Sequence, residues 1–344
     1  MKVAIDISPL NDSGSVRGIG TYTNYLVNDL KKISGKIQIT TFSGKDIPES
    51  DLIHYPYFDL YFHTLPFRKT RPRVVTIHDV IPLVFKKHYP AGLKGRYNLF
   101  LQKLALKNTD AVICDSNTSK QDIHKILGYP FNKIYVIYLA PAPVFKPMQN
   151  SNYLENIRNK YKLPQEYFLF VGDVNWNKNI IGLLSAVKKT RVNLVLVGKA
   201  LLNQNLPQVR DINSEIEKLK IKNKIIKTGY IPDKDLSAIY NLATATIVPS
   251  FYEGFGLPVL ESMACGTPVL CSNNSSLSEI GHDTALFFDP HKKDDIKNAI
   301  TKFLSKSQKD REKISKDSQN LAAKYTWNNV TRQTTEVYDS VICK

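Results

Sequence analysis

The chain has 344 residues, 42% hydrophobic and 23% charged, a composition that excludes a disordered or fibrous protein. Its mean hydropathy is −0.25, and no apolar run approaches the roughly 18 residues needed to span a bilayer. Because residues 1–6 place an acid where a signal peptide is apolar, we expect no export by that route. The four cysteines show neither metal-type spacing nor a paired framework, which suits a reducing cytoplasm, the expected location.

The net charge is +16, from 47 lysines and arginines against 31 acids. Residues 1–150 carry 20 basic and 11 acidic residues (+9), and the remainder carries 27 and 20 (+7). Such an excess attracts nucleic acid, anionic lipid or phosphorylated small molecules, although solvated lysine-rich faces would give the same count. Because the charge is spread over both halves, it gives no support to a clustered nucleic-acid stripe.

The first half alternates short apolar runs with helical segments. We expect strands at 3–7, 37–41, 52–55, 74–77, 111–114 and 133–138, and helices at 21–32 and 93–107. Residues 140–147 contain three prolines, which break regular structure and indicate a linker.

The same alternation then restarts. Expected strands are 167–171, 192–197, 224–227, 245–248 and 269–272, with helices at 180–188, 213–219, 233–243, 258–265 and 292–304 and two more at the end. Strands separated by helices predict parallel sheets, so the fold class is α/β with two Rossmann-like domains. Ligands bind such sheets beyond the carboxyl ends of the strands, which directs attention to the strand-to-helix loops.

The loop after residue 248 is the richest in chemistry. Gly254 and Gly256 allow a ligand close to the backbone, and the following helix start offers amides and a dipole to an anion. Glu253 lies in this loop and Glu261 lies eight positions later, inside the helix. Two acids beside an anion site suit a sugar nucleotide, with phosphates on the amides and sugar hydroxyls on the acids. The alternative is a capped helix with ordinary surface glutamates.

Other loops offer weaker candidates. Lys178 stands at a helix start, where a cation is disfavoured unless it holds a phosphate; it could equally be solvated. His78 and Asp79 follow an expected strand, either as site residues or as a turn with a satisfied imidazole. Asp233 and Asp235 resemble a metal-binding pair, but the apolar helix after them predicts that Asp233 is an N-cap.

Two segments could contact a ligand or a membrane at the surface: the basic segment 93–107, and the aromatic-basic stretch 54–73, which could hold an acceptor or lipid headgroups. The first could lie on an anionic membrane, although an apolar stripe of this kind is more often core.

These motifs resemble those of the retaining glycosyltransferases of family 4. The strongest are Glu253-Gly-Phe-Gly-Leu-Pro with Glu261; Gly266-Thr-Pro-Val, Gly229-Tyr-Ile-Pro, Arg17-Gly-Ile-Gly and Ile77-His-Asp-Val-Ile-Pro are similar to other blocks. The last resembles mannosyltransferase branches of bacterial polysaccharide assembly. The resemblance implies the GT-B architecture, with two parallel sheets facing a central cleft. It implies an acceptor-side domain at 1–147, joined by a C-terminal helix at about 326–344, and a donor domain at 148–325.

The resemblance also implies roles. Glu261 would bind the ribose, Glu253 the donor sugar and Lys178 the pyrophosphate, while His78 would approach the sugar from the first domain. The other expected donor-binding residues are Gly18, Asn177, Ile231, Gly254, Phe255, Gly256 and Leu257. Asn177 stands where the family usually has arginine, so one of two phosphate cations is missing.

The predicted activity is transfer of a hexose, with mannose favoured, from GDP-mannose or a UDP-hexose to a glycan or lipid-linked glycan. The donor is a co-substrate, and neither a cofactor nor a metal is expected. Peripheral contact with an anionic membrane at its inner face is a further hypothesis, and no nucleic-acid partner is expected. The alternatives are a sugar-nucleotide epimerase of the same architecture and a basic nucleic-acid-binding protein.

Overall fold

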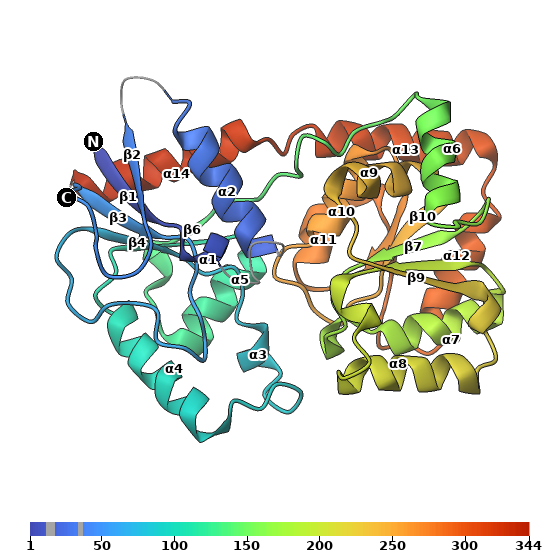
Figure 1. The fold of residues 1–344 in the computed structure, drawn as a ribbon, viewed down its shortest axis with the longest axis horizontal. Coiled ribbons are helices and arrows are strands. Elements are labelled where there is room, and N and C mark those ends of the chain that lie inside the picture. The colour runs from blue at the N-terminus through green and yellow to red at the C-terminus, as the bar shows by residue number, and fades with distance from the viewer. Residues whose placement is uncertain (12–17, 34–36, 344) are drawn as a thin grey trace. The chain divides into compact units, whose positions relative to one another are not determined.

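A computed structural model describes residues 1–11, 18–33 and 37–343 of the chain (Figure 1). The chain forms two compact units: Met1–Ala140 with Thr326–Lys344, and Pro141–Tyr325. None of the helices in the described ranges combines the length and the apolar character of a membrane span.

The first unit is built on a six-stranded parallel sheet of order β2-β1-β3-β4-β5-β6. Every residue of its central strands β3, β4 and β5 is buried, because both faces of the sheet are covered. The strands are β1 (Lys2–Asp6), β2 (Gln38–Phe42), β3 (Leu52–Tyr55), β4 (Arg73–Thr76), β5 (Ala111–Cys114) and β6 (Ile134–Val136). The helices are α1 (Ser8–Asn11), α2 (Gly18–Leu30), α3 (Ile81–Val84), α4 (Gly92–Leu106), α5 (Asn117–Asp122) with the π-turn Ile123–Leu127, and α14 (Trp327–Ile342).

The last helix, α14, completes the core of this unit. Its side chain Tyr338 is fully buried, and the phenol lies 2.6 Å from Nδ1 of His54 on β3. At the other end of the helix, Trp327 stacks on Tyr25 of α2 with ring centroids 5.0 Å apart. Burial lowers the pKa of His54 to about 3, so the imidazole stays neutral within this contact.

The second unit has its own six-stranded parallel sheet, of order β12-β11-β10-β7-β8-β9. Helix α7 packs against both α8 and α12, and α10 packs against α9, α11 and α13. The strands are β7 (Phe168–Val171), β8 (Leu194–Val197), β9 (Ile225–Gly229), β10 (Ala245–Val248), β11 (Val269–Ser272) and β12 (Leu286–Phe288). The helices are α6 (Ser151–Lys160), α7 (Ile180–Thr190), α8 (Pro207–Lys218), α9 (Asp233–Leu242), α10 (Leu257–Ala264), α11 (Ser275–Gly281), α12 (Asp295–Leu304) and α13 (Gln308–Ala322).

The predicted α/β class with two parallel sheets is confirmed. The sequence did not predict β12, which has three residues and holds its place by pairing with β11. It also did not predict α6, whose residues are mostly polar, with Ile157 as the one buried member. Tyr153 and Tyr161 anchor this region by donating hydrogen bonds to Asp235 at the start of α9. Tertiary contacts rather than local apolar periodicity therefore fix both elements.

Candidate functional site

The loop between β10 and α10 is shaped by one glycine. Gly256 occupies the N-cap of α10 with φ of 112°, a conformation that favours glycine, and a Cβ there would lie 2.9 Å from Leu277. No side chain caps α10, and Pro258 lies in its first turn. The positive end of the helix dipole is therefore at the loop that carries Gly254 and Phe255, as an anion site requires.

Glu253 and Lys178 form an ion pair at this loop. Nζ of Lys178 donates to both carboxylate oxygens of Glu253 at 2.8 Å, and Oγ of Ser250 donates to one of them at 2.6 Å. The backbone of Glu253 is held as well, since its amide donates to Ser275 and its carbonyl accepts from Ser276. The structure thus joins two predicted site residues that are 75 positions apart.

Asparagines on both sides of Lys178 fasten its loop to that of Glu253. The side-chain amide of Asn177 donates to the carbonyl of Tyr252 at 2.8 Å, and the Asn177 carbonyl accepts from the amide of Phe251 at 2.7 Å. Asn179 donates to the Pro249 carbonyl at 3.0 Å and also caps α7. Asn177 is buried, so its side chain links the two loops at the position where the resemblance implies a second cation.

Glu261 lies on α10 in an environment that favours the protonated form of its carboxyl group. The phenol of Tyr240, from α9, donates to Oε2 at 2.8 Å. Burial raises the pKa of Glu261 from 4.5 to about 7; the Tyr240 hydrogen bond opposes this rise, and the nearby Asp233 adds to it. Tyr240 is fully buried within the apolar stripe of α9, and the sequence offered no signal for its role.

Of the two acids in the first turn of α9, Asp233 does not cap the helix as predicted. The N-cap of α9 is Pro232, with no side-chain cap, and Asp233 is the first helical residue, so the predicted Asp233 N-cap is wrong. The fixed φ of the proline already sets the helix start, and its carbonyl accepts from Leu236. Asp235 forms an ion pair with Lys160 at 2.6 Å. Within the described residues, no group of three or more His, Cys, Asp or Glu side chains could hold a metal ion.

In the first unit, His78 lies beside Asp115 at the carboxyl ends of the neighbouring strands β4 and β5. Nδ1 of His78 donates to Oδ2 of Asp115 at 2.7 Å. Burial acts to lower the pKa of His78, but the Asp115 carboxylate, together with Asp79 and the Pro56 carbonyl, outweighs it, and the pKa is raised. Burial also raises the pKa of Asp115. Nε2 of His78 is buried and meets no partner at hydrogen-bonding geometry in the described structure, although the Pro56 carbonyl is close enough to favour the protonated ring.

The remaining predicted residues are placed as follows. Gly18 is the first residue of α2, and a Cβ there would meet nothing within 4 Å. Arg17, from the same motif, lies outside the described residues. Ile231 is buried in the short turn between β9 and α9, and Leu257 begins α10. The second unit therefore holds Asn177, Lys178, Ile231, Glu253, Gly254, Phe255, Gly256, Leu257 and Glu261, and the first unit holds Gly18 and His78.

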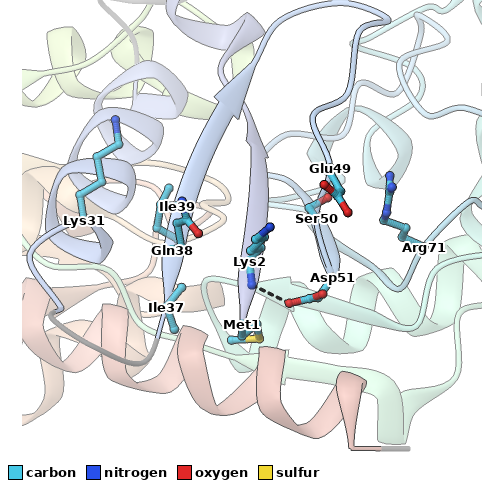
Figure 2. A pocket seen from close by; sticks show the side chains of 10 residues that line it. All are labelled: Met1, Lys2, Lys31, Ile37, Gln38, Ile39, Glu49, Ser50, Asp51 and Arg71. Atoms are coloured by element: carbon cyan, nitrogen blue, oxygen red, sulfur yellow. Dashed lines mark hydrogen bonds between the residues drawn. The ribbon is translucent and has the colours of Figure 1, made fainter.

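A hollow of about 820 Å³ in the first unit lies at the amino ends of its strands (Figure 2). It adjoins the first residues of β1, β2 and β3, whereas His78 follows the last residue of β4. Its charges are mixed, with Lys2, Lys31 and Arg71 near Glu49 and Asp51. It is separate from the predicted site residues.

Two family descriptions match this chain, one in each unit. Glycosyltransferase Family 4 matches residues 17–140, and Glycosyl transferases group 1 matches residues 155–321. Together they cover the larger part of both sheets.

Several curated relatives are mannosyltransferases. O-antigen chain mannosyltransferase B of Escherichia coli is 32% identical over 82% of this chain and 74% of that protein. The MMP alpha-(1->4)-mannosyltransferase of Mycolicibacterium hassiacum is 30% identical over 95% of both chains. The serotype-specific mannosyltransferase WbdA of E. coli is 32% identical over 74% of this chain, which spans only 32% of that longer protein.

Solved structures agree on the fold. Sucrose-phosphate synthase from Thermosynechococcus elongatus superposes with a TM-score of 0.79 at 18% identity, over 100% of this chain and 99% of that one. HepE of Anabaena, solved in complex with UDP and glucose, gives 0.77 at 18% identity over 99% and 100%. With two parallel sheets, two family matches and relatives above 30% identity, the chain belongs to glycosyltransferase family 4 and is a glycosyltransferase of the GT-B fold.

Proposed function

We propose that the protein transfers mannose from a nucleotide diphosphate sugar to a glycan or lipid-linked glycan, with retention at the anomeric carbon. The observation that carries the proposal is the Lys178–Glu253 pair next to the uncapped start of α10. It places a cation, a carboxylate and a helix dipole at the carboxyl edge of one sheet, where α/β proteins bind nucleotides. The names of the relatives favour mannose over other hexoses.

Lys178 and the start of α10 supply the positive potential for the diphosphate. Charge grows on the leaving diphosphate as the glycosidic bond breaks, and preorganised donors stabilise it without reorganising. When the donor enters, the Lys178 ammonium exchanges part of its contact with Glu253 for phosphate oxygens. The Glu253 carboxylate then accepts hydrogen bonds from sugar hydroxyls. In this proposal the protein provides the stabilisation of the leaving group, so the reaction proceeds without a metal ion.

Glu261 binds the ribose diol of the nucleotide, and Ile231 and Leu257 lie beside the nucleoside. Ribose binding by the ionised acid takes a proton from a carboxyl whose pKa is about 7. Nucleotide affinity should therefore rise with pH up to about 8. Tyr240 is a positioning residue here, since its phenol orients the carboxylate through the 2.8 Å hydrogen bond.

His78 and Gly18 contribute from the first unit, His78 to the donor sugar and Gly18 to the phosphates. Asp115 is the positioning residue of His78: it accepts from Nδ1 and favours the charged ring, and in that form Nε2 can donate to a ligand. The sequence alone did not indicate Asp115, because it is 37 positions from its partner.

The experiment is saturation-transfer NMR with GDP-mannose, GDP-glucose, UDP-glucose and UDP-galactose, followed by turnover of the sugar nucleotide that binds. Binding of GDP-mannose, lost in Glu261→Ala, supports the donor assignment. The coupling constant of the anomeric proton in the product reports retention or inversion. Conversion of the donor to an isomeric sugar nucleotide without an acceptor would instead identify an epimerase.

A further inference from the structure

Helix α4 carries two apolar faces, of which one is buried and one is exposed. The buried face contains Gly95, Gln102, Ala105 and Leu106. Leu93, Tyr97, Phe100 and Leu104 are 85%, 63%, 58% and 37% exposed. Their spacing of four, three and four residues aligns them in one stripe, which helical geometry places opposite Gly95 and Gln102. We call this stripe the α4 face.

The neighbouring loop 59–67 extends the apolar surface. It is fixed to the buried side of α4 by Gln102, whose Oε1 accepts from the amides of Thr64 and Leu65 and whose Nε2 donates to the carbonyl of Asp59. Phe62 and Phe67 on this loop are exposed. Asn98 and Asn108 donate to the carbonyls of Tyr61 and Phe67 and hold the loop along the helix.

The surroundings of the α4 face are cationic. Residues 80–109 include six lysines and arginines and no acid. Lys94, Arg96 and Lys107 are exposed next to the stripe, and in the described residues none of them forms an ion pair. An exposed row of leucine and aromatic side chains flanked by unneutralised cations has the chemistry of an interfacial helix on anionic lipid.

We propose that the α4 face, with the exposed phenylalanines of loop 59–67, docks the protein on an anionic lipid bilayer. The apolar side chains enter the boundary between headgroups and acyl chains, and the cations contact lipid phosphates. Because the helix is held to the fold by Gln102, the docking surface is preformed. The proposal is independent of the donor and acceptor, and its test needs no turnover.

The experiment is sedimentation of the full chain with vesicles of phosphatidylcholine, with and without phosphatidylglycerol, at low salt. Binding should require phosphatidylglycerol and weaken near 1 M salt, where the Debye length falls to about 3 Å. Lys94→Gln with Arg96→Gln should weaken binding about 25-fold, since each cation near such a surface contributes about fivefold. The matched control is Lys309→Gln with Lys313→Gln, two exposed cations on α13, which should bind like the wild type.

Leu93→Ser with Phe100→Ser tests the apolar part and should abolish binding while the unfolding midpoint stays unchanged, because both side chains are exposed. Leu304→Ser, at an exposed leucine of α12, is its control. Tyr97→Trp should show emission shifted to shorter wavelength when phosphatidylglycerol vesicles are added. The proposal would be overturned if the wild type did not bind vesicles at low salt, or if the Leu93/Phe100 variant bound them equally well. It would also be overturned if the wild type formed a dimer through this face, shown by its dissociation in the variant, and did not bind lipid.

Discussion

Glu261→Gln should make the empty enzyme more stable and a poorer binder of nucleotide. A carboxyl with a pKa of about 7 when folded and 4.5 when unfolded costs about 3 kcal/mol when it ionises in the fold. Because the folded pKa is the higher one, this group's contribution to stability is complete below pH 4.5 and is lost as pH rises through about 7. Glutamine keeps the acceptor for Tyr240 and does not ionise.

The free energy of unfolding of Glu261→Gln should therefore match that of the wild type near pH 4.5 and exceed it at pH 8. Part of the Glu261 residue reaches solvent, so the expected gap at pH 8 is about 1–3 kcal/mol. Urea unfolding at a series of pH values measures it. Glu312→Gln, at an exposed position of α13, is the control and should show no pH-dependent gap.

The same site should respond oppositely to nucleotide. Loss of a bidentate contact to the ribose diol in Glu261→Ala should cost on the order of 2–3 kcal/mol, or about 30–150-fold in the Kd of the nucleoside diphosphate. Titration calorimetry at pH 8 measures this. A stability gap that does not change with pH would refute the raised pKa, and unchanged affinity in a folded variant would refute the ribose assignment.

Three further predictions concern the rest of the site. Lys178→Ala should lower kcat by about 10²–10³ and change KM less, because the charge that Lys178 stabilises grows in the transition state. Wild-type activity should survive a chelator, and strict dependence on Mn²⁺ or Mg²⁺ would contradict leaving-group stabilisation by the protein alone. Asp115→Asn should lower the pKa of His78, because burial then acts without the opposing carboxylate; NMR titration of the ring and a shift of the matching activity limb to lower pH check it, and an unmoved pKa would show that Asp115 does not set it. Gly256→Ala should destabilise the fold by roughly 1–3 kcal/mol in urea unfolding, whereas Gly18→Ala, where a Cβ meets open space, should not; equal effects would show that backbone conformation at the loop is unimportant.

Local patterns were sufficient for the parallel sheets, apart from β12, and for the loop of Glu253 and Glu261. Buried parallel strands are continuous apolar runs, and glycine with proline marks the loop, so both signals lie within a few residues. The partners of the site residues carry no such signal. Lys178 and Glu253, and Tyr240 and Glu261, are brought together only by the order of strands in the sheet and by packing between helices.

Helix α4 shows a different limit of sequence reasoning. Its apolar residues predict a helix, but they do not say which side is buried, because both faces carry them. Gln102 decides the orientation through hydrogen bonds to a loop about 40 positions earlier in the chain. A search for apolar periodicity gives no weight to a polar residue such as Gln102, although this residue lies at the centre of the buried face.

The contact between Tyr338 and His54 also sets an order of events during synthesis. The two residues are 284 positions apart, yet both belong to the first unit, while Pro141–Tyr325 is a continuous segment. At about 5–20 residues per second, the ribosome needs about 10–40 s to proceed from the end of the first sheet to Tyr338. The second unit is made in full within this interval, so the half of the protein that is translated first is the half that is finished last. Until α14 emerges, the surface that it will cover, including the imidazole of His54, remains open to water and to chaperones.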